Sequence, residues 1–184
     1  MPVKKSYLKG KRILAVDDEK DVLDTIEDAL EEAEVDKAQD YQSALEKLNK
    51  NRYDLAILDI MGVDGLKLLE KAVARNIPSL MLTAHALSAE TLLSSIRIGA
   101  VSYLPKEKLA ELEEILEDLL AAIDAGEPTW KLLFDRLGGF FDQKFGSDWK
   151  EKDRKFWNEF SRTYHVSKGI QSRLKHDERV ISKV

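Results

Sequence analysis

The sequence predicts an α/β fold, a doubly wound sheet of five parallel strands followed by a helical extension. Short apolar runs alternate with segments of helical periodicity five times in about 115 residues, which is typical of a parallel sheet covered on both faces. All three Trp and all six Phe lie after residue 129. The net charge is −9 over residues 1–124 and +4 over residues 125–184, so composition divides the chain into two modules.

Strands are expected where apolar residues follow one another and turn residues bound the run. The first run carries Ile13 to Val16 into Asp17-Asp18, the second is more polar, and the third ends on Asp59. The fourth follows Pro78, and the fifth is a short segment ending at Pro105. In chain order, the predicted strands are residues 12–18, 35–39, 55–59, 78–83 and 102–105.

Helices are expected between these strands, where apolar residues recur every three or four positions. In the first, Val22, Ile26 and Leu30 share one face, and the last is rich in Leu. In chain order, the predicted helices are residues 19–33, 42–51, 65–75, 88–98 and 108–123. The resulting domain organisation is a polar leader over residues 1–10, an α/β domain over 11–124 and a helical, aromatic-rich extension over 125–184.

The extension has its own periodicity. A helix is predicted over Thr129–Leu137, interrupted at Gly138-Gly139 and continued over Phe140–Phe145. A last helix is expected to begin at Ser147 or Asp148, because Asp148 and Glu151 have the spacing of a capping box. Its apolar stripe would hold Trp149, Phe156, Phe160 and Tyr164, and some helix is expected around residues 171–175.

Composition excludes several classes of protein. The chain has no cysteine, so disulfides and sites that need thiolate ligands are ruled out. No run approaches the roughly 18 apolar residues that span a bilayer. The basic N-terminus, Met1 to Ser6, has no apolar segment behind it that would make a secretory signal. We therefore expect a cytoplasmic protein with no membrane attachment.

Acidic side chains follow two of the predicted strands, Asp17-Asp18 after the first and Asp59 at the end of the third. In an open parallel sheet, ligands bind at the carboxyl ends of the strands. If these two strands are neighbours, three carboxylates converge there, so that either one is protonated or a divalent cation neutralises them. An all-oxygen site of this kind suits Mg²⁺.

Four short motifs now stand in register on the βα pattern. They are Val16-Asp17-Asp18-Glu19, Leu58-Asp59-Ile60-Met61, Leu82-Thr83-Ala84 and Tyr103-Leu104-Pro105-Lys106. In this order and spacing, the chain resembles the receiver domain of bacterial two-component response regulators over about residues 10–124. The resemblance implies a flavodoxin-like strand order, 2-1-3-4-5.

The resemblance also implies roles for individual residues. Asp59 would be the phosphoacceptor, taking a phosphoryl group from a sensor histidine kinase or a phosphotransfer protein. Lys106 would contact the phosphoryl oxygens, and Thr83 would move to hydrogen-bond one of them while Tyr103 rotates inward behind it. The implied Mg²⁺ ligands are Asp17, Asp18, Asp59 and the backbone carbonyl of Met61.

Two features depart from the family pattern. The loop Asp59 to Gly65 is about two residues short and has no proline, which affects the expected Met61 contact and the lifetime of the phosphoryl group. Glu107 replaces the proline that usually follows the lysine. A cis bond before a residue other than proline costs roughly 2.5–4 kcal/mol, so the Lys106–Glu107 bond is expected to be trans or visibly strained.

Several alternatives stay open. Asp17-Asp18 alone fits a helix cap, Thr83 and Tyr103 alone fit ordinary strand packing, and His85 fits either tuning of phosphoryl hydrolysis or a solvent-facing loop. The extension carries only a weak basic excess and no helix-turn-helix pattern, so nucleic-acid binding is not expected, although a DNA-binding transcriptional regulator is the second hypothesis. A Mg²⁺-dependent phosphatase is the third.

The primary prediction is a response regulator with no enzymatic activity beyond accepting and slowly losing its own phosphoryl group. Phosphorylation would switch a protein-interaction surface. A homodimer is a further prediction, through the face formed by the fourth helix, fifth strand and fifth helix or through the C-terminal helices.

Overall fold

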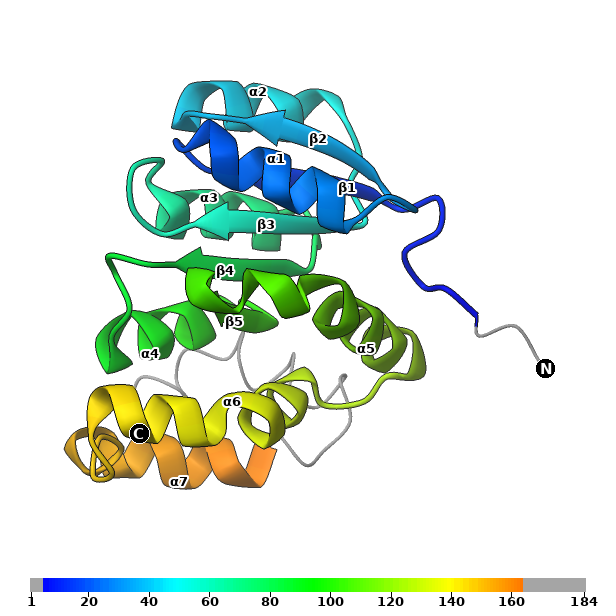
Figure 1. Ribbon diagram of the computed structural model, residues 1–184. Coiled ribbons are helices and arrows are strands. Elements are labelled where there is room, and N and C mark those ends of the chain that lie inside the picture. The colour runs from blue at the N-terminus through cyan, green and yellow to red at the C-terminus, as the bar shows by residue number, and fades with distance from the viewer. Residues whose placement is uncertain (1–4, 164–184) are drawn as a thin grey trace.

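The computed structural model describes residues 5–163 of the chain (Figure 1). The strands are β1 (Arg12–Val16), β2 (Glu34–Ala38), β3 (Leu55–Asp59), β4 (Ser79–Thr83) and β5 (Ser102–Pro105). The α-helices are α1 (Lys20–Ala29), α2 (Tyr41–Lys50), α3 (Gly65–Ala74), α4 (Ala89–Ile98), α5 (Leu112–Ala125), α6 (Thr129–Phe145) and α7 (Arg154–Thr163). Short 3-10 helices, η1 (Lys106–Glu111) and η2 (Glu151–Asp153), precede α5 and α7.

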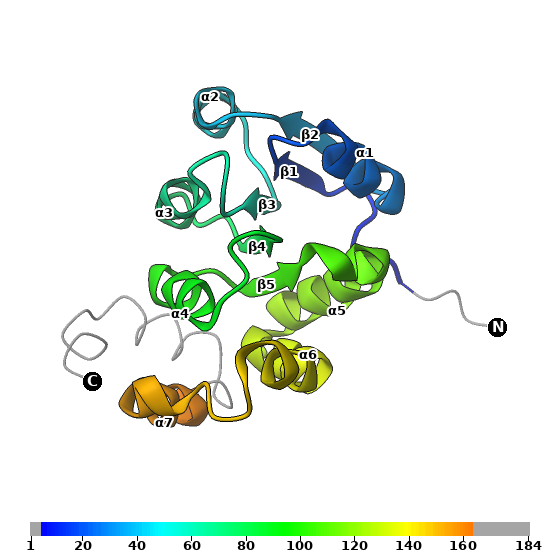
Figure 2. The same ribbon diagram turned by 60° about the vertical axis from the view of Figure 1, so that its left-hand side comes forward.

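The five strands form one parallel sheet in the order β2-β1-β3-β4-β5, which confirms the predicted fold class. Figure 2 shows α1 and α5 on one face of the sheet and α2, α3 and α4 on the other. Every residue of β3, β4 and β5 is buried, as expected for strands with helices on both faces, whereas the edge strand β2 is more exposed. The sheet therefore forms the centre of the hydrophobic core.

Two of the helices on the α2–α3–α4 face begin with a side-chain cap that fixes where the loop ends. The Asp40 carboxylate accepts the Ser43 N–H at 2.7 Å, and the Ser88 hydroxyl accepts the Thr91 N–H at 3.1 Å. Each bond satisfies one of the amide groups left without a partner at a helix N-terminus. The α4 cap at Ser88 also fixes the end of the loop that follows β4.

The leader is tied to α5 from Ser6 onward. The Glu117 carboxylate of α5 accepts hydrogen bonds from the Ser6 hydroxyl and the Tyr7 amide, both at 2.7 Å. Leu8, the next residue, is buried in the core. Residues 6–8 therefore pack with the α/β domain.

The extension differs from its prediction in two places. Helix α6 runs without a break through Gly138-Gly139, because the apolar residues on either side are held by packing that offsets the low helix propensity of glycine. The last helix begins at Arg154, after η2, and not at Ser147 or Asp148. Trp149 lies in the turn before it, whereas Phe156 and Phe160 do share the buried face of α7. Tyr164 and residues 171–175 lie outside the described residues.

Helices α6 and α7 lie beyond the β5 edge of the sheet and extend from α5 across to α4 (Figure 2). Their aromatic side chains form one continuous cluster through edge-to-face and stacked contacts. Within residues 5–163, no helix is both long enough and apolar enough to cross a bilayer.

Candidate functional site

Four strands deliver the predicted site residues to one edge of the sheet. In the parallel register, Val16 lies opposite Leu58, Asp59 opposite Leu82, and Thr83 opposite Pro105. Asp17, Asp59, Thr83 and Lys106 therefore all emerge where their strands end. The topology alone brings together residues that are up to 89 positions apart in the chain.

The carboxylates of this site differ sharply in exposure. Asp17 is 0% and Asp59 is 5% exposed, whereas Asp18 and Glu19 are exposed. Oxygen atoms of Asp17, Asp18 and Glu19 lie within 4.8 Å of one another, close enough to share a cation. Glu19 was not assigned to the site from the sequence, although the run Asp-Asp-Glu was the signal that could have identified it. The Asp17 carboxylate accepts the Glu19 amide at 2.9 Å, which holds the turn.

Lys106 supplies the positive charge. Its Nζ lies 2.8 Å from Asp17 Oδ2, 3.2 Å from Glu19 Oε1 and 3.6 Å from Asp59 Oδ2, and its side chain is only 11% exposed. Burial alone would lower the pKa of Lys106, but the contacts with Asp17 and Asp59 raise it above its usual value. The ammonium is therefore held in its charged form among the carboxylates.

The single positive charge of Lys106 does not neutralise the several carboxylates around it. Burial, then the negative charge of Asp17, raises the pKa of Asp59 from 3.8 to about 6, although Lys106 opposes the rise. Burial also raises the pKa of Asp17, against the stabilising contact with Lys106. A cluster of oxygen ligands with surplus negative charge, one part buried and one part open to solvent, fits a hard divalent cation that retains several waters.

The loop after β3 passes directly over the exposed carboxylate. Gly62 has a φ of +87°, and a Cβ added there would lie 2.5 Å from Asp18 Oδ2. Only glycine accommodates both the backbone conformation and this approach. Met61 lies in the same loop and is 55% exposed, and the role of its carbonyl as a metal ligand stays a prediction.

Thr83 and Tyr103 lie behind the carboxylates. Thr83 is buried, and its Oγ1 has no hydrogen-bond partner among the described residues. Tyr103 is fully buried, and its hydroxyl lies 2.8 Å from Thr91 Oγ1 and 3.4 Å from the Ser88 amide. Burial raises the pKa of Tyr103, while the hydroxyl groups of Thr91 and Thr83 and the Ser88 amide oppose the rise.

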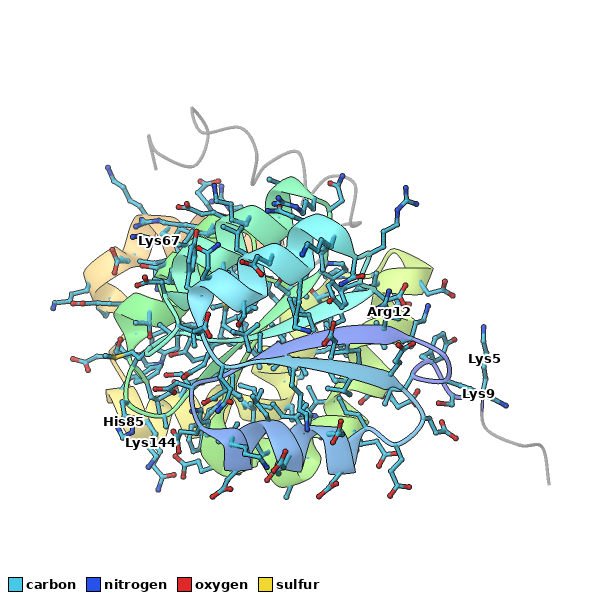
Figure 3. The ribbon with its side chains drawn as sticks, turned by 90° about the horizontal axis from the view of Figure 1, so that it is seen from above. Lys5, Lys9, Arg12, Lys67, His85 and Lys144 are labelled. Atoms are coloured by element: carbon cyan, nitrogen blue, oxygen red, sulfur yellow. The ribbon has the colours of Figure 1, made fainter. Side chains whose placement is uncertain are left out.

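Two further sequence expectations concern the rim of the site. No cis peptide bond occurs in residues 5–163, so the Lys106–Glu107 bond is trans, one of the two outcomes expected. His85 is exposed on the loop between β4 and α4, and Figure 3 shows it at the edge of the molecule. The structure gives His85 no contact with the carboxylates.

Known proteins match both the sequence and this geometry. The profile of the response regulator receiver domain matches residues 13–117. The two-component response regulator ARR10 of Arabidopsis thaliana is 34% identical over 119 residues, which cover 60% of this chain and 21% of that protein. The phosphate regulon transcriptional regulatory protein PhoB of Klebsiella pneumoniae is 34% identical over 120 residues, covering 58% of this chain and 52% of that protein. The chain thus spans about a fifth of the plant relatives and about half of the bacterial ones.

Solved structures agree. A CheY-like response regulator receiver domain protein from Methanospirillum hungatei superposes with a TM-score of 0.58 at 31% identity, covering 64% of this chain and 98% of that one. A response regulator from Chloroflexus aurantiacus gives a TM-score of 0.55 at 30% identity, covering 61% and 99%. The strand order, the carboxylate and lysine cluster and the match over more than half of the chain place this protein in the response regulator receiver domain family of two-component systems.

Proposed function

We propose that Asp59 accepts a phosphoryl group from the phosphohistidine of a sensor histidine kinase or a phosphotransfer protein, and that this event switches a protein-interaction surface. The observation that carries the proposal is the position of Asp59. Its carboxylate is almost fully buried, lies 3.6 Å from the Lys106 ammonium, and adjoins a second buried carboxylate, Asp17. A structural ion pair would need one acid for one lysine, not this surplus.

Mg²⁺ is the cation that these residues suit. Asp17, Asp18 and Asp59 would hold it together with the Met61 carbonyl, and Glu19 adds a fourth carboxylate beside them. A bound Mg²⁺ would neutralise part of the charge on the phosphoryl oxygens. Burial, and then the negative charge of Asp17, raises the pKa of Asp59, and a cation held here would offset that charge.

The transfer itself follows from the chain's own groups. An Asp59 carboxylate oxygen attacks phosphorus, the P–N bond of the donor breaks, and its electron pair stays on the imidazole nitrogen. The attack requires ionised Asp59, which a pKa of about 6 permits at neutral pH. Lys106 donates hydrogen bonds to the phosphoryl oxygens. The free hydroxyl of Thr83, at the end of the adjacent strand, is available to donate another.

Incubation with acetyl phosphate and Mg²⁺ is expected to raise the intact mass by one phosphoryl group. Asp59→Asn should abolish this adduct, because the amide is not a nucleophile. Asp64→Asn is the matched control: it makes the same chemical change on an exposed residue of the same loop, and its adduct should equal that of the parent protein. No adduct on the parent protein, or an adduct that survives Asp59→Asn, would contradict the proposal.

DNA binding is the second candidate, because the relative PhoB is described as a transcriptional regulatory protein. Against it, two basic residues of α6 are paired within the chain: Arg136 with Glu114 and Asp118, and Lys131 with Asp135. A strongly salt-dependent affinity for duplex DNA would favour this function, and the absence of binding at low salt would remove it.

We also propose that the chain has no separate enzymatic activity and acts in the cytoplasm. A Mg²⁺-dependent phosphatase built on the same carboxylates would turn over a phosphorylated substrate many times. A single stoichiometric acyl phosphate on Asp59 would instead support the receiver function.

A further inference from the structure

The extension occupies the face formed by α4, β5 and α5. The Trp130 indole of α6 donates to the Ala100 carbonyl, in the loop before β5, at 3.1 Å. Arg136 of α6 lies 3.0 Å from Asp118 of α5. From α7, the ring of Phe156 receives the Arg97 guanidinium of α4 at 5.1 Å from its centroid. A homodimer through this face would therefore have to displace the chain's own helices (Figure 2).

The extension reaches the centre of this face through Phe141. Its ring packs edge-on against Tyr103, with centroids 6.0 Å apart and an interplanar angle of 65°, and both side chains are fully buried. The Tyr103 hydroxyl points the other way, toward Ser88 and Thr91 at the start of α4. Phe141 therefore packs against the ring of Tyr103, while the hydroxyl of the same tyrosine contacts the start of α4. If the Tyr103 ring rotated outward, it would collide with Phe141.

Gly138 and Gly139 lie within the continuous helix α6, just before this contact. A Cβ on either glycine would meet nothing within 4 Å, and neither has a positive φ, so neither space nor backbone conformation requires glycine there. Two adjacent glycines lower the cost of opening a helix at that point. The residues before them carry the Trp130 and Arg136 anchors, and the residues after them carry Phe141 and lead to α7.

We propose that residues 140–163 form an arm, hinged at Gly138-Gly139, whose docking on Tyr103 and phosphorylation of Asp59 stabilise each other. The proposal rests on the proposed function of Asp59. It makes the α4–β5–α5 face a docking surface for a segment of the same chain. The docking equilibrium of the arm thus responds directly to phosphorylation of Asp59.

Thr83 provides the physical link. Thr83 ends β4, and the loop that follows it leads to Ser88 and Thr91, whose amide nitrogen and hydroxyl lie 3.4 Å and 2.8 Å from the Tyr103 hydroxyl. When the Thr83 hydroxyl turns toward a phosphoryl group on Asp59, the loop that follows it shifts, and with it the groups that contact the Tyr103 hydroxyl. These contacts hold the tyrosine ring in the buried position, which is the position that Phe141 packs against. Because coupling between two sites is reciprocal, a docked arm must favour phosphorylation by the same factor.

Hydrogen–deuterium exchange of the full chain tests the coupling in one direction. With acetyl phosphate and Mg²⁺, exchange of residues 140–163 is expected to slow by about fivefold or more, the lower end of usual allosteric coupling. Residues 129–137 should change little, and Asp59→Asn should show no change. Intact mass measured on the same sample separates the outcomes. A phosphoryl adduct with unchanged or faster exchange overturns the coupling alone, whereas no adduct overturns both the coupling and the proposed function.

The reverse direction uses the extent of phosphorylation as its readout. Phe141→Ala should lower the phosphorylated fraction at limiting acetyl phosphate by about fivefold in the equilibrium ratio, and Gln143→Ala, an exposed change on the same helix, should not. Gly138→Ala with Gly139→Ala restores helix propensity without a clash, so it should raise that fraction and slow exchange of the arm. The double variant keeps the test valid if Phe141→Ala fails to fold. Unchanged phosphorylation in the double variant, despite a slower-exchanging arm, overturns the proposal.

Discussion

Asp59→Asn is expected to stabilise the metal-free protein by ~3 kcal/mol at pH 8 and to have little effect at pH 4. The native pKa of Asp59 is raised to about 6, because the carboxylate is buried and lies near Asp17. A rise of this size from 3.8 corresponds to ~3 kcal/mol between the two protonation states.

The sign follows from proton binding. Well below pH 3.8, Asp59 is protonated in both the native and the unfolded state, so its charge costs nothing. As the pH rises through about 6, the native carboxyl ionises in a buried site, and the parent protein loses stability that the uncharged Asn retains. Urea unfolding at several pH values, in the presence of a metal chelator, measures the difference in free energy of unfolding between Asp59→Asn and the parent protein. A gain that is equal at pH 4 and pH 8 would show that the effect is not electrostatic, and Asp64→Asn should show no such pH dependence.

Trp130→Ala is expected to destabilise the protein by ~4 kcal/mol. Trp130 is fully buried between the extension and the α/β domain, and loss of a buried aromatic side chain costs ~3–5 kcal/mol. Its indole N–H also satisfies the Ala100 carbonyl, which the substitution leaves without that partner.

Two other variants separate these contributions. Trp130→Phe keeps most of the apolar volume and loses the hydrogen bond, so it should cost ~1–2 kcal/mol. Gln143→Ala, an exposed change on α6, should stay within ~0.5 kcal/mol. Urea unfolding followed by far-UV circular dichroism reports mainly on the larger α/β domain. If Trp130→Ala left that midpoint unchanged, the extension would not stabilise the domain on which it packs.

The strands and helices of the α/β domain could be predicted because short stretches of sequence determine them. Runs such as Leu55–Asp59 are apolar throughout and end on the residue that does chemistry, so both the strand and the site candidate could be read together. The strand order could not be predicted in this way, since no local pattern indicates which strands pair. It came from the resemblance and is confirmed by the register of β1 with β3.

The extension was less predictable because long-range packing decides its details. Glycine propensity predicted a break at Gly138-Gly139, but flanking aromatic contacts hold α6 together. The capping-box spacing predicted a helix start at Asp148, yet Trp149 folds back to donate to the Asp142 carboxylate at 2.8 Å, and the helix forms later. The contact between Phe141 and Tyr103 has no local signature at all.

The hydrogen bonds between the leader and Glu117 have a practical consequence for fragment design. A receiver fragment that begins at Lys11, where composition alone would cut the chain, removes Leu8 from the core and strips the Glu117 carboxylate of the Ser6 and Tyr7 donors. Domain swaps that graft this receiver onto other output modules should therefore begin at or before Lys5. A chimera cut later would lose signalling through poor folding, and that loss could be mistaken for incompatibility between the joined domains.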